Sequence, residues 1–379
     1  MSRRWMCVLM LVCALVLVMP RAWAQRLPET DPPSGVIGQD INMAWDRSAM
    51  PGDIEIWAPK TLIAHEGTGT AGYGHLFLTC ASETDSSTGK CATEDTHESA
   101  RGILSRVPVR LTERRGGMPA EVTVKGALYR IDPVTWCSSD YWHRELYTLY
   151  SSYAQTCLGE PVVGTGASLL LEADELQGLT AGHWQGKLEL DLRKPPSQSL
   201  AKYVFNFDFT VTDYDAISIY FPGFDGIAPL VNMDLRYDPI RKMVGGYKEV
   251  DMCLYDGVGS QSEFLGVTVR DSGPRPPPGR DFAVWHQDGG SDDTQRLDYH
   301  VRLSYGGNEL AMKHGEEQLL RGIDSAQLRM VLLPGISQPV YCVPTPLTLE
   351  TPPTPIASQR PGIYEGELTV ELRVPTAKP

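Results

Sequence analysis

A glycine-rich stretch is the first feature of the sequence that could do chemistry. Gly67 to Gly72 has the spacing G-x-G-x-x-G, which binds the phosphates of a dinucleotide when it joins a strand to a helix. The residues that follow, Tyr73 to Leu78, are typical of a strand rather than of a helix. We therefore expect a flexible turn here and no nucleotide site.

An acidic loop, Asp288 to Asp293, offers the oxygen atoms that Ca²⁺ prefers. It lacks the spacing and the final glutamate of an EF-hand, so a solvated hairpin loop is the favoured interpretation. The eight histidines have no metal-binding spacing, and no G-x-S-x-G motif of a serine hydrolase occurs. We expect no metal, no cofactor and no catalysis; a glycosidase pair formed by two distant carboxylates is the remaining catalytic alternative.

The composition sets limits on the elements that could position such residues. The chain has 379 residues, enough for two domains of ordinary size. Its 36 glycines and 29 prolines favour turns over long helices. The net charge is −13, from 34 Lys and Arg against 47 Asp and Glu. Because phosphate binding requires a basic surface, this charge excludes nucleic acid as a partner and disfavours an anionic bilayer.

Residues 1–24 have the pattern of a secretory signal peptide. Arg3 and Arg4 precede an apolar stretch from Trp5 to Pro20, and Ala22-Trp23-Ala24 then supplies the small residues of a cleavage site. The apolar stretch is shorter than the roughly 20 residues that a membrane-spanning helix needs. We expect the remainder of the chain to be exported.

Six cysteines would remain after that cleavage, and an even number predicts disulfides in an oxidising compartment. No pair has the C-x-x-C spacing of a structural zinc site. The division into domains proposed below leaves four cysteines in one domain and two in the other. We predict the bonds Cys80–Cys91, Cys137–Cys157 and Cys253–Cys342.

An internal repeat indicates the architecture. Residues 181–193, AGHWQGKLELDLR, match residues 361–373, PGIYEGELTVELR, without a gap. Both copies alternate apolar and polar residues, as a half-buried strand does. Similar closing strands so far apart predict two β domains of related plan.

The segment between the two copies suggests the domain boundary. Lys194 to Ser199 is rich in Pro and Ser, which suits a semi-rigid linker. We therefore predict a first domain at residues 25–193, a linker at 194–200 and a second domain at 201–379. Short alternating stretches separated by turns, with little helical pattern, predict an all-β protein made of two β-sandwich domains in tandem.

Two motifs resemble those of one family. DMCLYDG, at residues 251–257, and the pattern G-x-Y-x-G-x-L-T-V, from Gly362 to Val370, are similar to motifs of the alternate chaperone–usher pilus tip proteins. These are the initiators of colonization-factor and cable pili, the CfaE/CblD type. The resemblance extends over nearly all of the chain after the signal peptide. In the first domain it consists of length, position and the closing strand.

This resemblance implies a fimbrial tip adhesin that also initiates pilus assembly. The N-terminal domain would bind a host-surface glycan or glycoprotein. The C-terminal domain would be a pilin-like, immunoglobulin-like sandwich that lacks its last strand. A periplasmic chaperone would lend it a strand, the N-terminal extension of the major pilin would then replace that strand, and an outer-membrane usher is the further partner. The protein would pass through the periplasm to the fimbrial tip.

In the pilin plan, the first and last strands of the C-terminal domain flank the groove for the donor strand. An alternating strand follows the predicted linker, and a second one closes the chain. From the residues alone, the alternative is that both are core strands of a closed domain. The predicted groove residues are Phe205, Phe207, Phe209 and Val211 on one side and Leu368, Val370, Leu372 and Val374 on the other.

The resemblance also implies a positively charged receptor patch suited to acidic sugars. One stretch of this acidic chain is basic, and guanidinium groups suit carboxylates. Trp136, Tyr141 and Trp142 could add ring faces nearby. The alternative for each arginine is an ordinary solvated side chain. The candidates are Arg101, Arg106, Arg110, Arg114, Arg115 and Arg130, with Lys125 between them.

Two other functions are alternatives to the tip adhesin. One is a structural pilus subunit without a receptor. The other is a secreted, two-domain carbohydrate-active enzyme.

Overall fold

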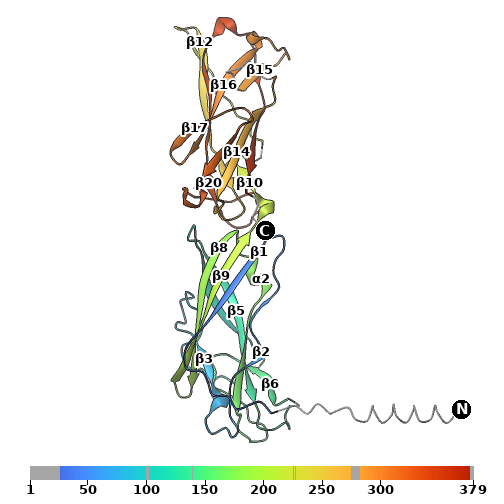
Figure 1. The fold of residues 1–379 in the computed structure, drawn as a ribbon, viewed down its shortest axis with the longest axis vertical. Helices are drawn as coiled ribbons and strands as arrows, with labels where there is room; N and C mark the ends of the chain where they lie inside the picture. The colour runs from blue at the N-terminus through green and yellow to red at the C-terminus, as the bar shows by residue number, and fades with distance from the viewer. Residues whose placement is uncertain are drawn as a thin grey trace, which may run out of the picture.

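The computed structural model describes residues 26–99, 102–138, 140–224, 226, 228–274 and 282–375. They form two elongated β domains stacked end to end, the N-terminal domain below and the C-terminal domain above in Figure 1. Each domain has a core of its own. The predicted all-β class with two tandem domains is confirmed. The predicted signal peptide lies outside the described residues. Among those residues, no helix is long and apolar enough to cross a membrane.

One sheet curls around the core of the N-terminal domain. Its elements are β1 (Gly35–Asp46), β2 (Ile54–His65), a 3₁₀ turn (Tyr73–His75), β3 (Phe77–Thr79), β4 (Ser105–Glu113), β5 (Pro119–Ile131), β6 (Trp142–Tyr147), β7 (Gly164–Leu171), α2 (Ala173–Leu176), β8 (Gly182–Lys194) and β9 (Gln198–Thr212). The path through the sheet is β1-β9-β8-β4-β5-β7-β2, with β3 added to β8 and β6 to β5.

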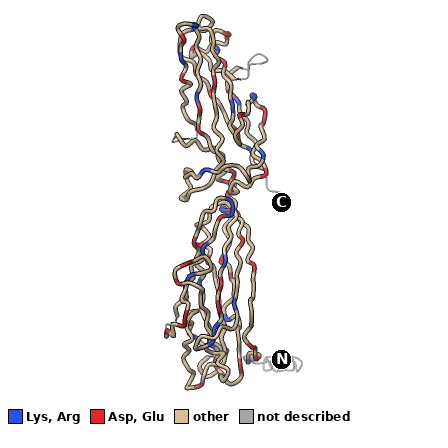
Figure 2. Tube along the Cα trace, turned by 90° about the vertical axis from the view of Figure 1, so that its left-hand side faces the viewer, with Lys and Arg blue, Asp and Glu red and all other residues tan. Residues whose placement is uncertain are grey.

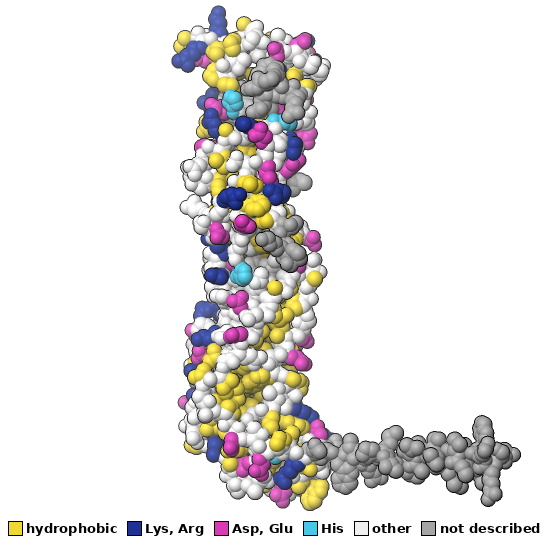
Figure 3. Space-filling view, in the orientation of Figure 1, with side chains coloured by type: hydrophobic (Ala, Val, Ile, Leu, Met, Phe, Trp, Pro, Cys, Tyr) yellow, Lys and Arg dark blue, Asp and Glu magenta, His cyan; other side chains and the backbone are white. Residues whose placement is uncertain are grey.

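The two ends of this sheet meet and close it around the core. Trp57 on β2 packs edge-on against Tyr203 and Phe205 on β9. The edge strands β1 and β2 form no ladder with each other in the described part of the chain. Figure 3 shows hydrophobic side chains in a diagonal band across this face of the lower domain. The closed arrangement brings the inward-facing residues of all the long strands into one core.

Strand β9 belongs to the N-terminal domain, so the predicted linker and domain boundary were wrong. β9 pairs antiparallel with β8 from Gly182↔Val211 to Lys194↔Gln198, and parallel with β1 along the whole of β1. Pro195 and Pro196, joined by a cis peptide bond, lie in the turn of the β8–β9 hairpin. The first domain therefore extends to Thr212, and the connection to the second domain lies at residues 213–217.

The first half of the predicted groove is consequently in the wrong domain. Phe205, Phe207, Phe209 and Val211 are no more than 2% exposed and lie in the core of the N-terminal domain. Their alternation predicted a strand with one buried face, which is correct. Alternation does not indicate which core the face joins, and a Pro-Pro-Ser segment suits a turn as well as a linker.

The C-terminal domain is a sandwich of shorter strands. They are β10 (Ser218–Tyr220), β11 (Arg236–Asp238), β12 (Met243–Val250), β13 (Cys253–Tyr255), β14 (Phe264–Asp271), β15 (Phe282–His286), β16 (Arg296–Tyr305), β17 (Asn308–Met312), β18 (Glu317–Arg321), β19 (Arg329–Val331), β20 (Val340–Pro344), β21 (Leu347–Pro355), β22 (Tyr364–Glu365) and β23 (Leu368–Arg373). Four 3₁₀ turns lie among them or just before them, at Tyr214–Ala216, Asp293–Gln295, Ile323–Ser325 and Ile356–Ser358.

Three sheets enclose the second core. One runs β11-β12-β21-β16-β15-β22, another β18-β14-β23, and the third β10-β13-β20-β19. Figure 1 places β10 and β20 at the end of this domain that meets the N-terminal domain. Leu265 and Val267 from β14 pack with Val301 from β16 and Leu349 from β21 between the layers.

All three predicted disulfides are present. Cys80–Cys91 and Cys137–Cys157 lie in the N-terminal domain, and Cys253–Cys342 joins β13 to β20 in the C-terminal domain. The corrected boundary leaves the same four cysteines in the first domain and the same two in the second. The prediction therefore did not depend on the residues that were misplaced.

Truncating Phe207 tests the placement of β9. Phe207→Ala should lower the free energy of unfolding of the N-terminal domain by about 3–5 kcal/mol, because it leaves a cavity in a closed core. Asn206→Ala, at the outward-facing neighbour, should change it by less than about 0.5 kcal/mol. Calorimetry of the full chain measures both variants. Equal, small effects of the two substitutions would contradict a buried β9.

Candidate functional site

Strand β23 is the strongest candidate for a binding element. It pairs with β14 from Gly266↔Arg373 to Asp271↔Leu368, and no described residue pairs with its other edge. Its inward-facing apolar side chains are only half-buried against the core. A closed sandwich avoids such an edge, because unpaired backbone groups invite another strand. The half-buried side chains are Leu368, Val370, Leu372 and, just beyond the strand, Val374.

A second incompletely covered part of the same core lies between β10 and β11. No strand is formed there by the residues that the structure describes. Apolar side chains of this segment pack against the core but stay partly exposed. These residues are Phe221, Phe224, Val231 and Met233, and Ile219 on β10 lies beside them in sequence.

The internal repeat shows what β23 lacks. Gly182, at the start of β8, and Gly362, before β22, have φ values of 153° and 156°. β8 is covered on one edge by β9 and on the other by β3 and β4, so Leu188, Leu190 and Leu192 are fully buried. β23 carries the matching residues but is paired on one edge only. Among the described residues, no strand pairs with the second edge of β23 as β9 pairs with β8.

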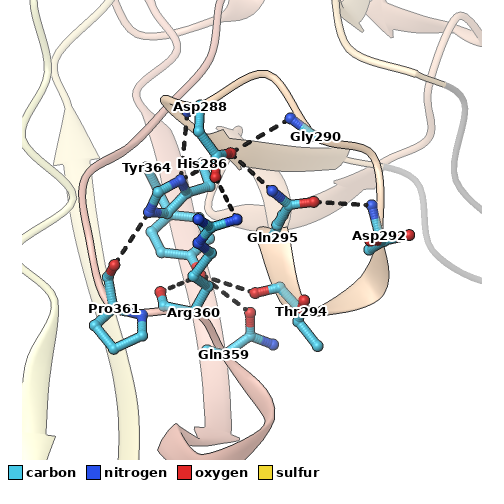
Figure 4. A network of polar contacts seen from close by, with 10 residues as sticks. All are labelled: His286, Asp288, Gly290, Asp292, Thr294, Gln295, Gln359, Arg360, Pro361 and Tyr364. Carbon is cyan, nitrogen blue, oxygen red and sulfur yellow. Dashed lines mark hydrogen bonds and ion pairs between the residues drawn. The ribbon is translucent and has the colours of Figure 1, made fainter.

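A polar network holds the chain just before β23. The Asp288 carboxylate accepts a hydrogen bond from Gln295 (2.7 Å) and pairs with Arg360 (Nη1 to Oδ2, 2.5 Å). His286 lies with Nδ1 3.0 Å from Asp288 and Nε2 3.1 Å from the carbonyl oxygen of Pro361. The Tyr364 hydroxyl donates to the carbonyl oxygen of Arg360 (2.7 Å), as Figure 4 shows. The acidic loop is therefore tied to the segment that leads into β23.

Neither the glycine-rich motif nor the acidic motif forms, among the described residues, the dinucleotide site or the Ca²⁺ site considered above. In the glycine-rich turn, the buried carboxylate of Glu66 accepts hydrogen bonds from the backbone of Ala71 (2.6 Å) and Tyr73 (2.9 Å). The amides of Ala71 and Tyr73 are thus used by the chain itself. The chain bends at residues 67–71 as expected, but Tyr73–His75 form a 3₁₀ turn, so the strand predicted from Tyr73 to Leu78 begins only at Phe77. In the described ranges, no group of three or more His, Cys, Asp or Glu is placed to hold a metal ion.

The predicted arginine patch includes a buried residue. Arg130 is completely buried and donates hydrogen bonds to the carbonyl oxygens of Leu76 and Ser151 (both 2.7 Å) and to the Thr165 hydroxyl (2.8 Å). Burial lowers the pKa of Arg130 to about 10, so it stays charged at neutral pH. Its role is to tie loops together, and its assignment to a receptor surface was wrong.

The remaining basic residues of the region do not form one patch. Arg106 pairs with Glu175 (3.6 Å), Arg110 with Asp85 (2.7 Å) and Lys125 with Glu172 (2.5 Å). Arg114 follows the end of β4, and Arg101 lies outside the described residues. Figure 2 shows basic and acidic residues mixed along both domains. Of the nearby aromatic residues, Trp142 is buried, Tyr141 is half-buried and Trp136 is exposed.

The sixth arginine joins the two domains. Arg115 donates to the carbonyl oxygens of Ile323 (3.2 Å) and Ala326 (2.5 Å) in the C-terminal domain, so its assignment to a receptor surface was also wrong. The Tyr341 hydroxyl donates in return to the carbonyl oxygen of Gly116 (3.0 Å). A side chain at Gly116 would lie 2.0 Å from the Tyr341 ring. This close approach requires glycine.

The motif DMCLYDG lies at the same junction. The Asp256 carboxylate accepts hydrogen bonds from the backbone of Val258, Ser260 and Ser262 (2.8–3.0 Å), which shapes the loop after the motif. Tyr255 and Cys253 of the motif pack with Ala181 from the N-terminal domain. The motif therefore builds the contact between the domains, a role that the resemblance alone did not indicate.

Two carboxylates at the junction of the domains, Asp46 at the end of β1 and Asp213 in the connection, have opposite pKa shifts. Burial would raise the pKa of Asp46, but hydrogen bonds from Ser48, Thr212 and Tyr214 outweigh it and lower the pKa to about 2. Burial raises the pKa of Asp213, and the ion pair with Arg47 (Nε to Oδ2, 3.4 Å) opposes this only in part.

Both domains match models of one protein family. Residues 20–214 match the first domain of CfaE, a fimbrial subunit of CFA/I, and residues 217–376 match the second domain of the same protein. The chain belongs to the CfaE family. The two matches meet at the boundary that the structure shows, after β9. They cover most of the chain, as the sequence resemblance implied.

Individual relatives in the family are distant but similar over most of their length. The CFA/I fimbrial protein CfaE of Escherichia coli is 26% identical over 307 residues, which cover 79% of this chain and 80% of that protein. The crystal structure of CfaE, the adhesive subunit of the CFA/I fimbria of enterotoxigenic E. coli, has a TM-score of 0.70 at 24% identity, over 93% and 95% of the two chains. A chaperone–tip adhesin complex of CFA/I fimbria biogenesis has a TM-score of 0.66 at 23% identity, and the match covers 93% of this chain and 99% of that chain.

Membership of the CfaE family decides between function classes. Its members are fimbrial subunits and not enzymes, so the expectation of a non-enzymatic protein is confirmed and the carbohydrate-active alternative is wrong. The residues that sequence reasoning missed are those at the domain junction. Arg47, Asp213 and Tyr341 stand in no motif, and only the loop around DMCLYDG gave a signal that could have pointed to them.

Loosening the junction should change the shape of the molecule. Arg115→Ala removes two hydrogen bonds between the domains, each worth about 1.5–3 kcal/mol with a charged donor. Small-angle X-ray scattering should then show a broader distribution of interdomain distances. Arg114→Ala, at the neighbouring residue of the same turn, is the matched control. Identical scattering from the two variants would contradict a junction fixed by Arg115.

Acid should weaken the connection at Asp46. Because its folded pKa of about 2 is below the ordinary value of 3.8, the stability that its ionised form contributes is complete above about pH 4 and is lost as the pH falls through 2. Asp46→Asn should therefore destabilise the chain at pH 5 but have little effect at pH 2. Denaturant unfolding at the two pH values measures this. Equal destabilisation by Asp46→Asn at pH 5 and at pH 2 would contradict the predicted titration of Asp46.

Proposed function

We propose that this chain is the tip adhesin of a fimbria and the initiator of its assembly. The C-terminal domain accepts a donor strand at the free edge of β23. The N-terminal domain binds a host-surface receptor, a glycan or a glycoprotein. The observation that supports this most directly is the edge of β23 that no described residue pairs, with its half-buried apolar face, in a chain of the CfaE family.

The hairpin β8–β9 indicates what the donor strand must be like. β9 bonds to the edge of β8 through its main chain and places Phe205, Phe207 and Phe209 over the core. A donor strand on β23 would do the same with alternate apolar side chains. It would cover Leu368, Val370 and Leu372, which correspond to the buried leucines of β8.

The partners follow from this requirement. A periplasmic chaperone supplies the strand first, which prevents aggregation at an exposed edge. The N-terminal extension of the major pilin then replaces it, and the outer-membrane usher passes the fibre to the surface. Within the described residues, the strand before the C-terminal domain is β9, and β9 is paired on both edges, with β1 and β8. The chain thus accepts a strand without offering β9 to a neighbour, as a tip requires.

The same geometry supports a receptor site at the free end of the N-terminal domain. The two domains are stacked end to end, so the lower end of the N-terminal domain in Figure 1 points away from the fibre. Of the predicted receptor arginines that the structure describes, Arg106, Arg110 and Arg114 lie on or just after β4 and outside the core. Two of these are already paired with carboxylates. They are weaker candidates than the end itself.

Two substitutions on β23 test the donor-strand site. The melting temperature of the full chain should rise when a peptide copied from the N-terminal extension of the fimbria's major pilin is added, and a scrambled peptide should have no effect. Val370→Asp, on the half-buried face, should abolish the rise. Thr369→Asp, on the exposed face of the same strand, should preserve it. If Val370→Asp fails to fold, Val370→Ser gives the same comparison. A wild-type chain indifferent to the peptide would overturn the proposal.

A further inference from the structure

Three large apolar side chains are exposed at the end of the C-terminal domain that faces away from the N-terminal domain. Ile240 is 92% exposed, Tyr237 51% and Ile356 43%. Tyr237 lies on β11 and Ile240 in the turn between β11 and β12, whereas Ile356 begins the 3₁₀ turn that follows β21. Figure 1 places β12 and this 3₁₀ turn, drawn in red, at the top of the molecule. We call these three side chains the end patch.

Hydrogen bonds tie the two turns of the end patch to each other. The backbone N–H of Ile356 donates to the carbonyl oxygen of Lys242 (3.0 Å), and the ladder between β12 and β21 extends up to these turns. Within the β11–β12 turn, the Asp238 carboxylate accepts a hydrogen bond from the backbone N–H of Ile240 (2.9 Å). Apolar side chains on turns fixed in this way lose little conformational entropy on binding. Exposed apolar groups gathered at one end are typical of an interaction surface.

Basic side chains accompany the end patch in the same hairpin. Residues 236–242 contain three of them, the exposed Arg236, Arg241 and Lys242, against a single acidic residue, Asp238. Arg241 approaches Asp238 only to 3.9 Å, and that carboxylate already accepts a hydrogen bond within the turn. The chain as a whole has a net charge of −13, so this end differs from the average surface. A partner surface with an apolar centre and carboxylates at its rim would match it.

The direction of the proposed donor strand brings one particular partner to this end. β14 starts at the domain junction, because the loop before it lies against the N-terminal domain: a side chain at Gly259 would lie 2.7 Å from the Cα atom of Gly182. β14 therefore runs away from the junction, and β23, which is antiparallel to it, runs towards the junction. A donor strand that pairs antiparallel with β23, as β9 pairs with β8, runs away from the junction again. The body of the donor protein, which follows its N-terminal extension, then emerges at the end that carries the end patch.

We propose that the end patch is the docking surface for the body of the major pilin whose N-terminal extension pairs with β23. The pilin surface that meets it is apolar at its centre, with carboxylates placed opposite Arg236, Arg241 and Lys242. Because the strand and the body belong to one molecule, docking adds to strand pairing without a second association event. The proposal rests on the proposed donor-strand function and gives the same partner a second contact.

Comparing the whole pilin with a peptide copied from its N-terminal extension tests the end patch. The pilin is used with its own groove filled by a fused donor strand, so that it cannot polymerise. The wild-type full chain should bind the whole pilin at least tenfold more tightly than the peptide. Ile240→Asp should remove most of that difference and leave peptide binding unchanged. Leu332→Asp, at an apolar residue that is 59% exposed just after β19, near the junction, is the matched control and should bind the pilin like the wild type.

A charge reversal at the rim tests the acidic character of the partner surface. Arg241→Glu should weaken binding of the whole pilin at least threefold and make it less sensitive to salt, because an attraction between opposite charges is lost. Peptide binding should again be unchanged. Since Ile240, Arg241 and Leu332 are exposed, the melting temperatures of the free variants should equal that of the wild type.

The other outcomes each overturn a different statement. A wild-type chain that binds the whole pilin no more tightly than the peptide would overturn the docking surface while preserving the donor-strand site. Equal weakening of pilin and peptide binding by Ile240→Asp would also overturn it, because the substitution would then act on the strand site. Weaker binding of the periplasmic chaperone, with pilin binding unchanged, would assign the end patch to the chaperone and overturn pilin docking. A wild-type chain that binds neither peptide nor pilin would overturn the donor-strand function itself.

Discussion

The free edge of β23 is the constraint on which the rest of the structure depends. Its backbone groups face no described partner, and its apolar face is only half covered, so the C-terminal domain is unsatisfied where the N-terminal domain is complete. The contrast lies within one chain. β8 has the same sequence pattern, and β9 covers it. In the proposed function this domain takes a strand from another protein, and the N-terminal domain is left to bind the receptor.

The remaining features stabilise that arrangement at its two ends. The network around Asp288 and Arg360 fixes the chain where it enters β23. At the opposite end of the domain, the DMCLYDG loop and Arg115 join the C-terminal domain to the N-terminal one. Both sets of contacts join segments that are distant in sequence, which favours one geometry over a flexible hinge. The molecule can then present its far end at a distance from the fibre.

Much of this could be predicted from the sequence, because it depends on local pattern. The repeat identified the strands β8 and β23, and the even number of cysteines indicated the three disulfides. The domain boundary could not be predicted, since Pro195-Pro196 suits a hairpin turn and a linker equally. The locations of the Arg130 and Arg115 side chains could not be predicted either. The sequence alone does not tell whether an arginine is solvated, buried among carbonyl oxygens or bonded across two domains.

Hydrogen exchange of β8 and β23 in one sample tests the central claim most directly. The free chain should protect the amides of β8 strongly, whereas alternate amides of β23, which face its open edge, should exchange fast. Adding the pilin-derived donor peptide should raise the protection of β23 to the level of β8 and leave β8 unchanged. Equal protection of the two strands in the free chain would contradict the account, because it would mean that the C-terminal domain is already closed.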